Sequence, residues 1–140
     1  MVVVFYLLVS AVVLCMLMSI KALFSPLDEG MQKISLSHFI WLAFLYGTIC
    51  IGFALLYLLL EMRDMSVILD NGIRLTGDFF LMLETSIYFS TMTMFSVGYG
   101  DLTPIGIGRM IATVQAFVGY VLPAAFFVRT VIEFDHVSKR

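Results

Sequence analysis

The stretch that decides the fold is SVGYGD, from Ser96 to Asp101, which stands between two apolar segments. Glycine adopts positive φ angles without a steric penalty, and in this stretch glycine alternates with larger residues. The alternation predicts a backbone whose successive carbonyl oxygens point to one side. Val97 and Tyr99 then point to the other side, where we expect them to pack and brace the segment.

A row of carbonyl oxygens of this kind can replace the hydration shell of a dehydrated monovalent cation. We expect the carbonyls of Ser96, Val97, Gly98 and Tyr99 to contact the ion, with the Ser96 hydroxyl at the innermost site. Gly100 completes the ion-binding segment, because it is the second residue, after Gly98, that adopts a positive φ angle without a penalty. The sequence therefore contains a candidate ion-binding site made of main-chain oxygens.

The composition places this segment in a membrane. Of the 140 residues, 61% are hydrophobic and 13% are charged, whereas a soluble domain carries about 25% charged residues. Ten acidic and eight basic residues provide no basic patch, so we expect no nucleic-acid binding. Cys15 and Cys50 lie inside apolar runs, which argues against a disulfide framework or a metal site.

Three stretches are long enough to cross a bilayer, whose core of about 30 Å needs about 20 apolar residues in a helix. They run over residues 2–24, over 39–60, and from Thr103-Pro104 to about residue 132. Threonine caps helices and proline fits the first turn, so we expect Thr103 and Pro104 to open the third helix. The first stretch lacks a basic n-region and a clear cleavage site, which favours a transmembrane helix over a signal peptide.

A shorter apolar piece, from Asp78 to Phe95, lies directly before the SVGYGD segment and is rich in hydroxyl side chains. Thr76-Gly77-Asp78 supplies an N-cap and a negative charge at the positive end of the helix dipole. At this length, and next to glycine-rich sequence, we predict a re-entrant half-helix instead of a fourth span.

The run from Thr93 to Pro104 resembles the P-loop and TVGYGD signature of potassium channels. The order of the segments also matches that family: an outer helix, a pore helix, a selectivity filter and an inner helix. The resemblance implies an all-α integral membrane fold, a homotetramer in the lipid bilayer, and K+ ions in the filter with no organic cofactor. It implies a passive potassium channel and not an enzyme.

The apolar stretches and the resemblance, which covers the chain from the second stretch onward, together predict the domain boundaries. They are an N-terminal transmembrane helix at 1–25, a cytoplasmic loop at 26–38, a pore domain at 39–135 and a cytoplasmic tail at 136–140. The pore domain divides into the outer helix at 39–60, the extracellular loop at 61–77, the pore helix at 78–95, the filter at 96–101 and the inner helix at 104–134. Lysines in the first loop and at the end of the chain favour a cytoplasmic C-terminus, and we expect the plasma membrane.

Three residues are implied as supports of the filter: Asp101, Tyr88 and Phe95. In the family, the aspartate lies behind the extracellular mouth and faces an aromatic donor of the pore helix, whose place Tyr88 takes. A hydrogen bond from Tyr88 to Asp101 and simple interfacial packing of Tyr88 both fit the sequence. Phe95-Ser96 replaces the two threonines of many members, which leaves a weakly selective Na+/K+ channel open as an alternative.

Gly119 and Pro123 are the candidates for a gating hinge in the inner helix. Glycine weakens a helix and proline removes a backbone hydrogen bond, so we expect a bend there. Close packing at Gly119 and a fixed kink at Pro123 are the alternatives. Phe127 and Val131 follow at helical spacing and predict an apolar inner gate, although a lipid-facing position explains both side chains as well.

Glu84 and Arg109 are charged residues within apolar segments, for which a mutual pairing is one hypothesis and snorkelling of Arg109 is another. No span carries arginine at every third position, so we expect no voltage sensor of the charged-helix type. A membrane subunit of a potassium transporter and a non-conducting auxiliary subunit stay open as further alternatives. The chain is either a minimal channel or lacks a cytoplasmic gating domain that would act on it.

Overall fold

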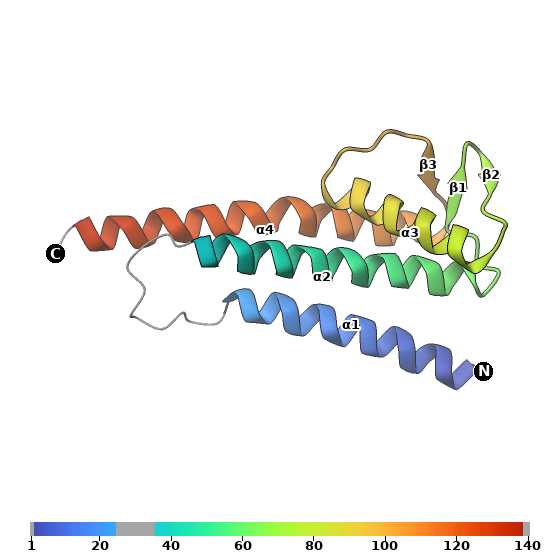
Figure 1. Ribbon diagram of the computed structural model, residues 1–140, viewed down its shortest axis with the longest axis horizontal. Helices are drawn as coiled ribbons and strands as arrows, with labels where there is room; N and C mark the ends of the chain where they lie inside the picture. Colours follow the sequence, from blue (N-terminus) through green and yellow to red (C-terminus); the bar gives the residue numbers. More distant parts are fainter. Residues whose placement is uncertain (1, 25–35, 139–140) are drawn as a thin grey trace.

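The computed structural model describes residues 2–24 and 36–138, with the backbone alone over parts of the first helix, over the start of the second and beyond residue 128. Its elements are α1 (Val2–Phe24), α2 (Leu36–Glu61), β1 (Ile68–Asp70), β2 (Ile73–Arg74), α3 (Phe79–Met94), β3 (Leu102–Pro104) and α4 (Ile107–Ser138). Three long helices run side by side, and the short α3 and the strands gather toward one end (Figure 1). The start of α1 and the end of α4 lie at opposite ends of the long axis.

Two of the described helices are long and apolar enough to cross a membrane, over Ile40–Glu61 and Ile107–Val128. Both expose large apolar side chains, among them Phe44 at 73% and Phe117 at 69%. Water disfavours such a surface, whereas lipid or a neighbouring protein does not. The second and third apolar stretches therefore form long helices, as the sequence predicts. The 23 residues of α1 form a helix alongside α2, and its crossing of the membrane stays a prediction.

The helix ends differ from the predicted ones by a few residues. α2 begins at Leu36, inside the predicted loop at 26–38, and α4 continues to Ser138, inside the predicted tail. α3 is one residue shorter at each end than the predicted pore helix at 78–95. Asp78 occupies the N-cap position of α3 without a capping hydrogen bond from its side chain.

The structure contains a small three-stranded sheet in the order β2-β1-β3, which the sequence did not predict. Its strands β1 and β2 lie within the predicted extracellular loop at 61–77. β1 and β2 are joined by Asn71 at φ 48° and Gly72 at φ 82°, a two-residue turn between the paired Asp70 and Ile73. Both turn residues have positive φ, which is the geometry that suits a tight hairpin. Asn-Gly is the sequence signal that would have predicted these strands.

The predicted opening of the inner helix at Thr103-Pro104 is wrong, because both residues belong to β3. They pair antiparallel with Leu69 and Ile68 of β1. Strand pairing satisfies backbone groups that a helix start would leave without partners. α4 consequently begins only at Ile107, after the sheet has fixed the chain that follows the SVGYGD segment.

The core lies where α3 packs against α2 and α4. Ile49, Phe53 and Tyr57 of α2 are buried at successive helical turns and form one continuous face. The Tyr57 ring meets Phe89 of α3 edge to face, with centroids 5.0 Å apart. The second half of this short helix, from Ser86 to Met94, is thereby held against α2 and α4.

A buried chain of polar groups joins the three helices behind this packing. The Tyr57 hydroxyl donates to Gln115 Oε1 at 3.0 Å. Gln115 Nε2 donates to Ser90 O at 2.9 Å and to Ser90 Oγ at 2.7 Å, and Ser90 Oγ donates to Cys50 O at 2.7 Å. Each donor has an acceptor, so these polar side chains are buried without the usual penalty.

Glu61 fixes the connection between the end of α2 and the strands. Its Oε1 accepts hydrogen bonds from the backbone N–H of Val67 at 2.7 Å and of Ile68 at 2.8 Å. Val67 O in turn accepts from Ile105 N at 2.9 Å, and a Cβ atom at Gly108 would overlap that same oxygen. One buried carboxylate therefore organises the point where α2, β1 and α4 meet.

We expect Glu61→Ala to lower the free energy of unfolding by about 2–4 kcal/mol, because it leaves two buried backbone donors without an acceptor. The measurement is the unfolding midpoint of the purified protein in detergent. Glu84→Gln is the matched control, since Glu84 is exposed, and it should leave the midpoint almost unchanged. Equal midpoints for both variants would contradict the structural role of Glu61.

Candidate functional site

The segment between α3 and β3 has an alternating backbone. Ser96, Gly98 and Gly100 have φ angles of 56°, 54° and 86°, whereas Val97 and Tyr99 are not in the positive range. This is the alternation that the glycine spacing predicts. Ser96 was not expected to take part, and a positive φ costs a residue with a Cβ atom about 1–2 kcal/mol. The surrounding contacts must therefore hold this residue in place.

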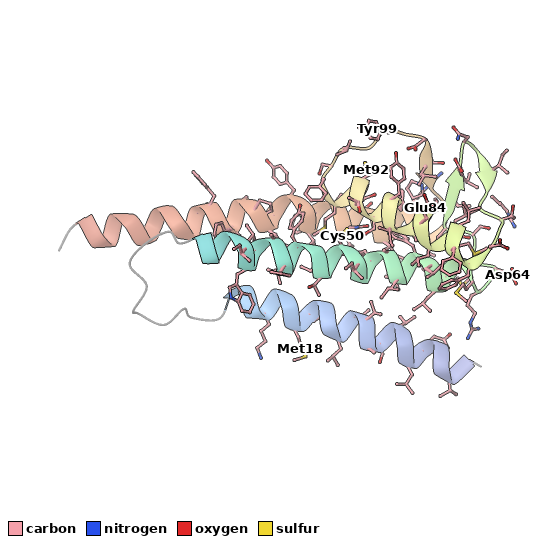
Figure 2. All side chains as sticks on the ribbon, in the orientation of Figure 1. Met18, Cys50, Asp64, Glu84, Met92 and Tyr99 are labelled. Atoms are coloured by element: carbon pink, nitrogen blue, oxygen red, sulfur yellow. The ribbon has the colours of Figure 1, made fainter. Side chains whose placement is uncertain are left out.

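The side chains of the segment are largely open to the surroundings of the chain. Val97 is 48% exposed, Phe95 59% and Tyr99 73%. Figure 2 shows Tyr99 at the crest of the loop, away from the long helices. The packing that we expected to brace Val97 and Tyr99 is therefore not supplied by this chain and needs a surface from elsewhere.

The carbonyl end of α3 lies directly before the segment, and hydrogen-bond donors surround it. Three of its last carbonyls accept from backbone amides of the residues that follow. These pairs are Phe95 N to Thr91 O at 3.0 Å, Ser96 N to Thr93 O at 3.1 Å and Val97 N to Met92 O at 2.9 Å. The turn out of the helix thereby sets the conformation of the first residues of the segment.

The two other carbonyls of this end receive donors from neighbouring helices. Ser90 O accepts from Gln115 of α4, and Met94 O accepts from the Tyr46 hydroxyl of α2 at 2.9 Å. The same hydroxyl lies 2.7 Å from Gly119 O of α4. The carbonyls of residues 90 to 93 therefore each have a donor, whereas Met94 O competes with Gly119 O for the single proton of the Tyr46 hydroxyl.

Asp101 is held at the far end of the segment. The Tyr88 hydroxyl donates to Asp101 Oδ2 at 2.9 Å, so the hydrogen bond that was one of two interpretations of Tyr88 is present. Asn71 N donates to Asp101 O at 2.8 Å, which ties the same residue to the hairpin turn. The bond to Asp101 raises the pKa of Tyr88, which lies outside the two spanning segments, so the phenol stays protonated and keeps its donor.

Gly119 lies at the closest crossing of α4 with α3. A Cβ atom at Gly119 would overlap the carbonyl oxygen of Met94, which explains this glycine by close packing. α4 is unbroken through both Gly119 and Pro123, and their role as a hinge stays a prediction. Phe127 is 69% exposed, and the side chain of Val131 lies outside the described residues.

The hypothesis that Glu84 pairs with Arg109 is wrong within this chain. Arg109 Nε donates to Pro104 O at 3.2 Å, and Glu84 is exposed on α3. Arg109 lies at the start of α4, where it stays near the end of the helix bundle that carries the sheet. Snorkelling of Arg109 stays a prediction.

Three residues that matter here were not expected from the sequence: Tyr46, Gln115 and Glu61. Each is a polar side chain within or at the end of an apolar helix, and each donates to or accepts from backbone groups of other elements. A polar residue in such a helix is costly unless it has partners. That isolated polarity is the signal that would have marked them.

Comparison with known proteins also identifies a channel family. Residues 45–135 match the model of a protein family described as "Ion channel". The chain is 40% identical over 118 residues to Protein LctB of Bacillus caldotenax, covering 84% of this chain and 88% of that protein. It is 38% identical over 130 residues to Protein LctB of Geobacillus stearothermophilus, covering 93% and 97%. No solved structure matches.

We expect Tyr88→Phe to loosen the segment, because it removes the side-chain donor to Asp101. The measurement is hydrogen exchange of the backbone amides of residues 96–101, which should become faster. Tyr120→Phe is the control, since Tyr120 is 76% exposed and should leave exchange there unchanged. An unchanged exchange rate in Tyr88→Phe would show that Asn71 alone holds Asp101.

Proposed function

Because the chain belongs to the ion channel family that matches residues 45–135, we propose that it forms a potassium-selective channel that passes K+ passively across the membrane. The observation that carries this proposal is the alternating backbone of residues 96–100, placed at the carbonyl end of a short helix. Membership of a channel family also points away from an enzyme and makes a transporter subunit the weaker interpretation.

In this proposal the main-chain oxygens of Ser96, Val97, Gly98 and Tyr99 replace the water around a K+ ion, and the Ser96 hydroxyl adds the innermost ligand. Positive φ at every second residue supports it, because only an alternating backbone aims successive carbonyls to one side. Gly100 and Asp101 end the row, and the hydrogen bonds to Asp101 hold that end in place.

α3 contributes a favourable field to the same site. Its carbonyl end carries a partial negative charge, and that end leads directly into the segment. A cation in a central water-filled cavity near this end gains from the helix dipole. The short helix thus lowers the cost of holding K+ within the membrane.

A homotetramer is part of the proposal. One chain holds one filter segment, and a pathway surrounded by carbonyls needs several segments around an axis. The exposed side chains of Val97 and Tyr99 support this arrangement, because neighbouring copies would supply the surface that braces them. We propose the plasma membrane as the location, with the end of α4 in the cytoplasm and the sheet outside.

A weakly selective Na+/K+ channel is the second candidate, and two observations favour it. Ser96 holds a positive φ against the preference of a residue with a Cβ atom, and Phe95 is 59% exposed beside it. A filter whose base is strained and loosely packed would discriminate less between ions. Flux measurements with both ions separate the two candidates.

We propose that Gly119 and Pro123 act as a hinge and that Phe127 and Val131 form an apolar gate below it. α4 continues well past the segment toward the opposite end of the bundle (Figure 1), which gives room for such a constriction. We propose a cytoplasmic gating domain, outside this chain, as the partner that moves α4.

We expect proteoliposomes containing the purified chain to take up K+ in preference to Na+, with block by Ba2+, and we expect Gly98→Ala to abolish this flux. Alanine at φ 54° is strained and displaces the carbonyls beside it. Gly72→Ala is the matched control, because Gly72 also has a positive φ with open space around it but lies in the hairpin turn. It should conduct like the unmodified chain.

Equal K+ and Na+ flux in the unmodified chain would favour the weakly selective candidate. A loss of flux in both glycine variants would mean that backbone strain anywhere disables the protein, which would remove the support for a filter at residues 96–100. No flux of either ion in the unmodified chain would contradict the proposed channel.

We expect the purified chain to have the mass of four subunits in native mass spectrometry, because four segments are needed to surround one ion. The measurement is made in detergent, with the single-chain mass as the reference. A monomer or a mixed complex would contradict the homotetramer and favour an auxiliary membrane subunit.

A further inference from the structure

We propose that Tyr46 is the positioning residue that couples α4 to the base of the filter, an inference that rests on the proposed function. Its hydroxyl lies 2.9 Å from Met94 O and 2.7 Å from Gly119 O. These two oxygens belong to the last residue of α3 and to the middle of α4. One side chain from α2 therefore contacts both of the elements whose relative position would matter for conduction.

The hydroxyl has one proton and two acceptors within reach. A tyrosine hydroxyl donates a single hydrogen bond, so its proton is either shared between Met94 O and Gly119 O or donated to one of them. The distance between Gly119 O and the hydroxyl decides how strongly Gly119 O competes with Met94 O for the proton. A shift of α4 at Gly119 consequently changes the hydrogen bond that Met94 O accepts.

Met94 is directly connected to the residues that are proposed to bind K+. It is the last residue of α3, and Ser96 with its positive φ follows two positions later. The Tyr46 ring also lies beside the Phe95 ring, with centroids 5.2 Å apart and an angle of 54°. Tyr46 thus contacts both Met94 and Phe95, the two residues joined by the peptide bond at the end of α3.

The contact at Gly119 is close, because a Cβ atom there would overlap Met94 O. On the other side of Tyr46, an open apolar groove of about 520 Å3 is lined mainly by α2 and α3, with Phe95 at the end of α3 and Pro123 of α4 at its edge. The Phe95 side chain therefore borders open space, whereas Met94 O is in close contact with α4. A displacement of α4 at Gly119 is consequently expected to act on Met94 O directly.

Tyr57 provides the comparison that isolates this role. It is a tyrosine of the same helix, its hydroxyl also donates to a group of α4, Gln115 Oε1, and it is fully buried. It does not touch Met94 or Gly119 among the described contacts. Loss of its hydroxyl removes a hydrogen bond between the same two helices and acts through Gln115 on Ser90, four residues before Met94, without changing the donor of Met94 O.

The test is the K+ dependence of thermal stability for the purified full chain in detergent, with Na+ replacing K+ at constant ionic strength. Ions that bind the folded assembly raise its unfolding midpoint with the logarithm of their concentration relative to Kd, so the K+ concentration that gives a chosen rise of the midpoint is proportional to Kd. Tyr46→Phe should shift this K+ concentration upward by about three- to tenfold, the size expected for one hydrogen bond. Tyr57→Phe should lower the midpoint at every K+ concentration without shifting that concentration.

An unchanged K+ concentration in Tyr46→Phe, or an equal shift in both variants, would overturn the inference, because Tyr46 would then act as an ordinary structural contact. Absence of any K+-specific stabilisation in the unmodified chain would overturn the proposed function instead, together with the inference that rests on it. The unmodified chain therefore distinguishes the two failures.

A second substitution serves if Tyr46→Phe does not assemble. Replacement of Tyr46 by 3-fluorotyrosine keeps the ring and the hydroxyl and makes the hydroxyl a stronger donor, and the same replacement at Tyr57 is its control. A shift at position 46 alone of the K+ concentration that gives the chosen rise supports the inference. No shift at position 46, or the same shift at both positions, overturns it.

Discussion

A helix that ends inside an apolar layer must find donors for its last carbonyl groups, and the arrangement around α3 meets this requirement. Each unpaired carbonyl buried away from water would cost free energy. The carbonyls of residues 90–93 have donors, three from the chain that follows and one from Gln115, and the Tyr46 hydroxyl lies within reach of Met94 O. These donors allow the short helix to end where it does.

The same requirement explains why polar side chains stand inside apolar helices. Gln115 and Tyr46 reach the end of α3 from opposite neighbours, and Tyr57 orients Gln115 by donating to its oxygen. Gly119 removes the side chain that would otherwise keep α4 away from Met94 O. Close packing and hydrogen bonding thus depend on each other, because the donors reach the carbonyls of α3 only when the helices approach closely.

The segment from residue 96 to residue 101 is held at both of its ends. At the helix end, backbone amides of Phe95, Ser96 and Val97 return to α3. At the other end, the small sheet holds β3, and the side chain and backbone of Asp101 are bonded to Tyr88 and Asn71. Between these anchors the side chains of the segment remain open, which fits a surface that is completed by further copies of the chain.

The sequence by itself determined the apolar helices, the short helix before SVGYGD and the alternating backbone of that segment, since hydrophobic length and glycine spacing are local properties. It did not reveal β3 at Thr103-Pro104, and it proposed a pair of Glu84 with Arg109 that is not formed. Only the tertiary structure decided which polar groups meet, as Tyr46 with Met94 and Gly119 illustrates. Their partners lie 48 and 73 residues away along the chain, and the packing of the helices brings them together.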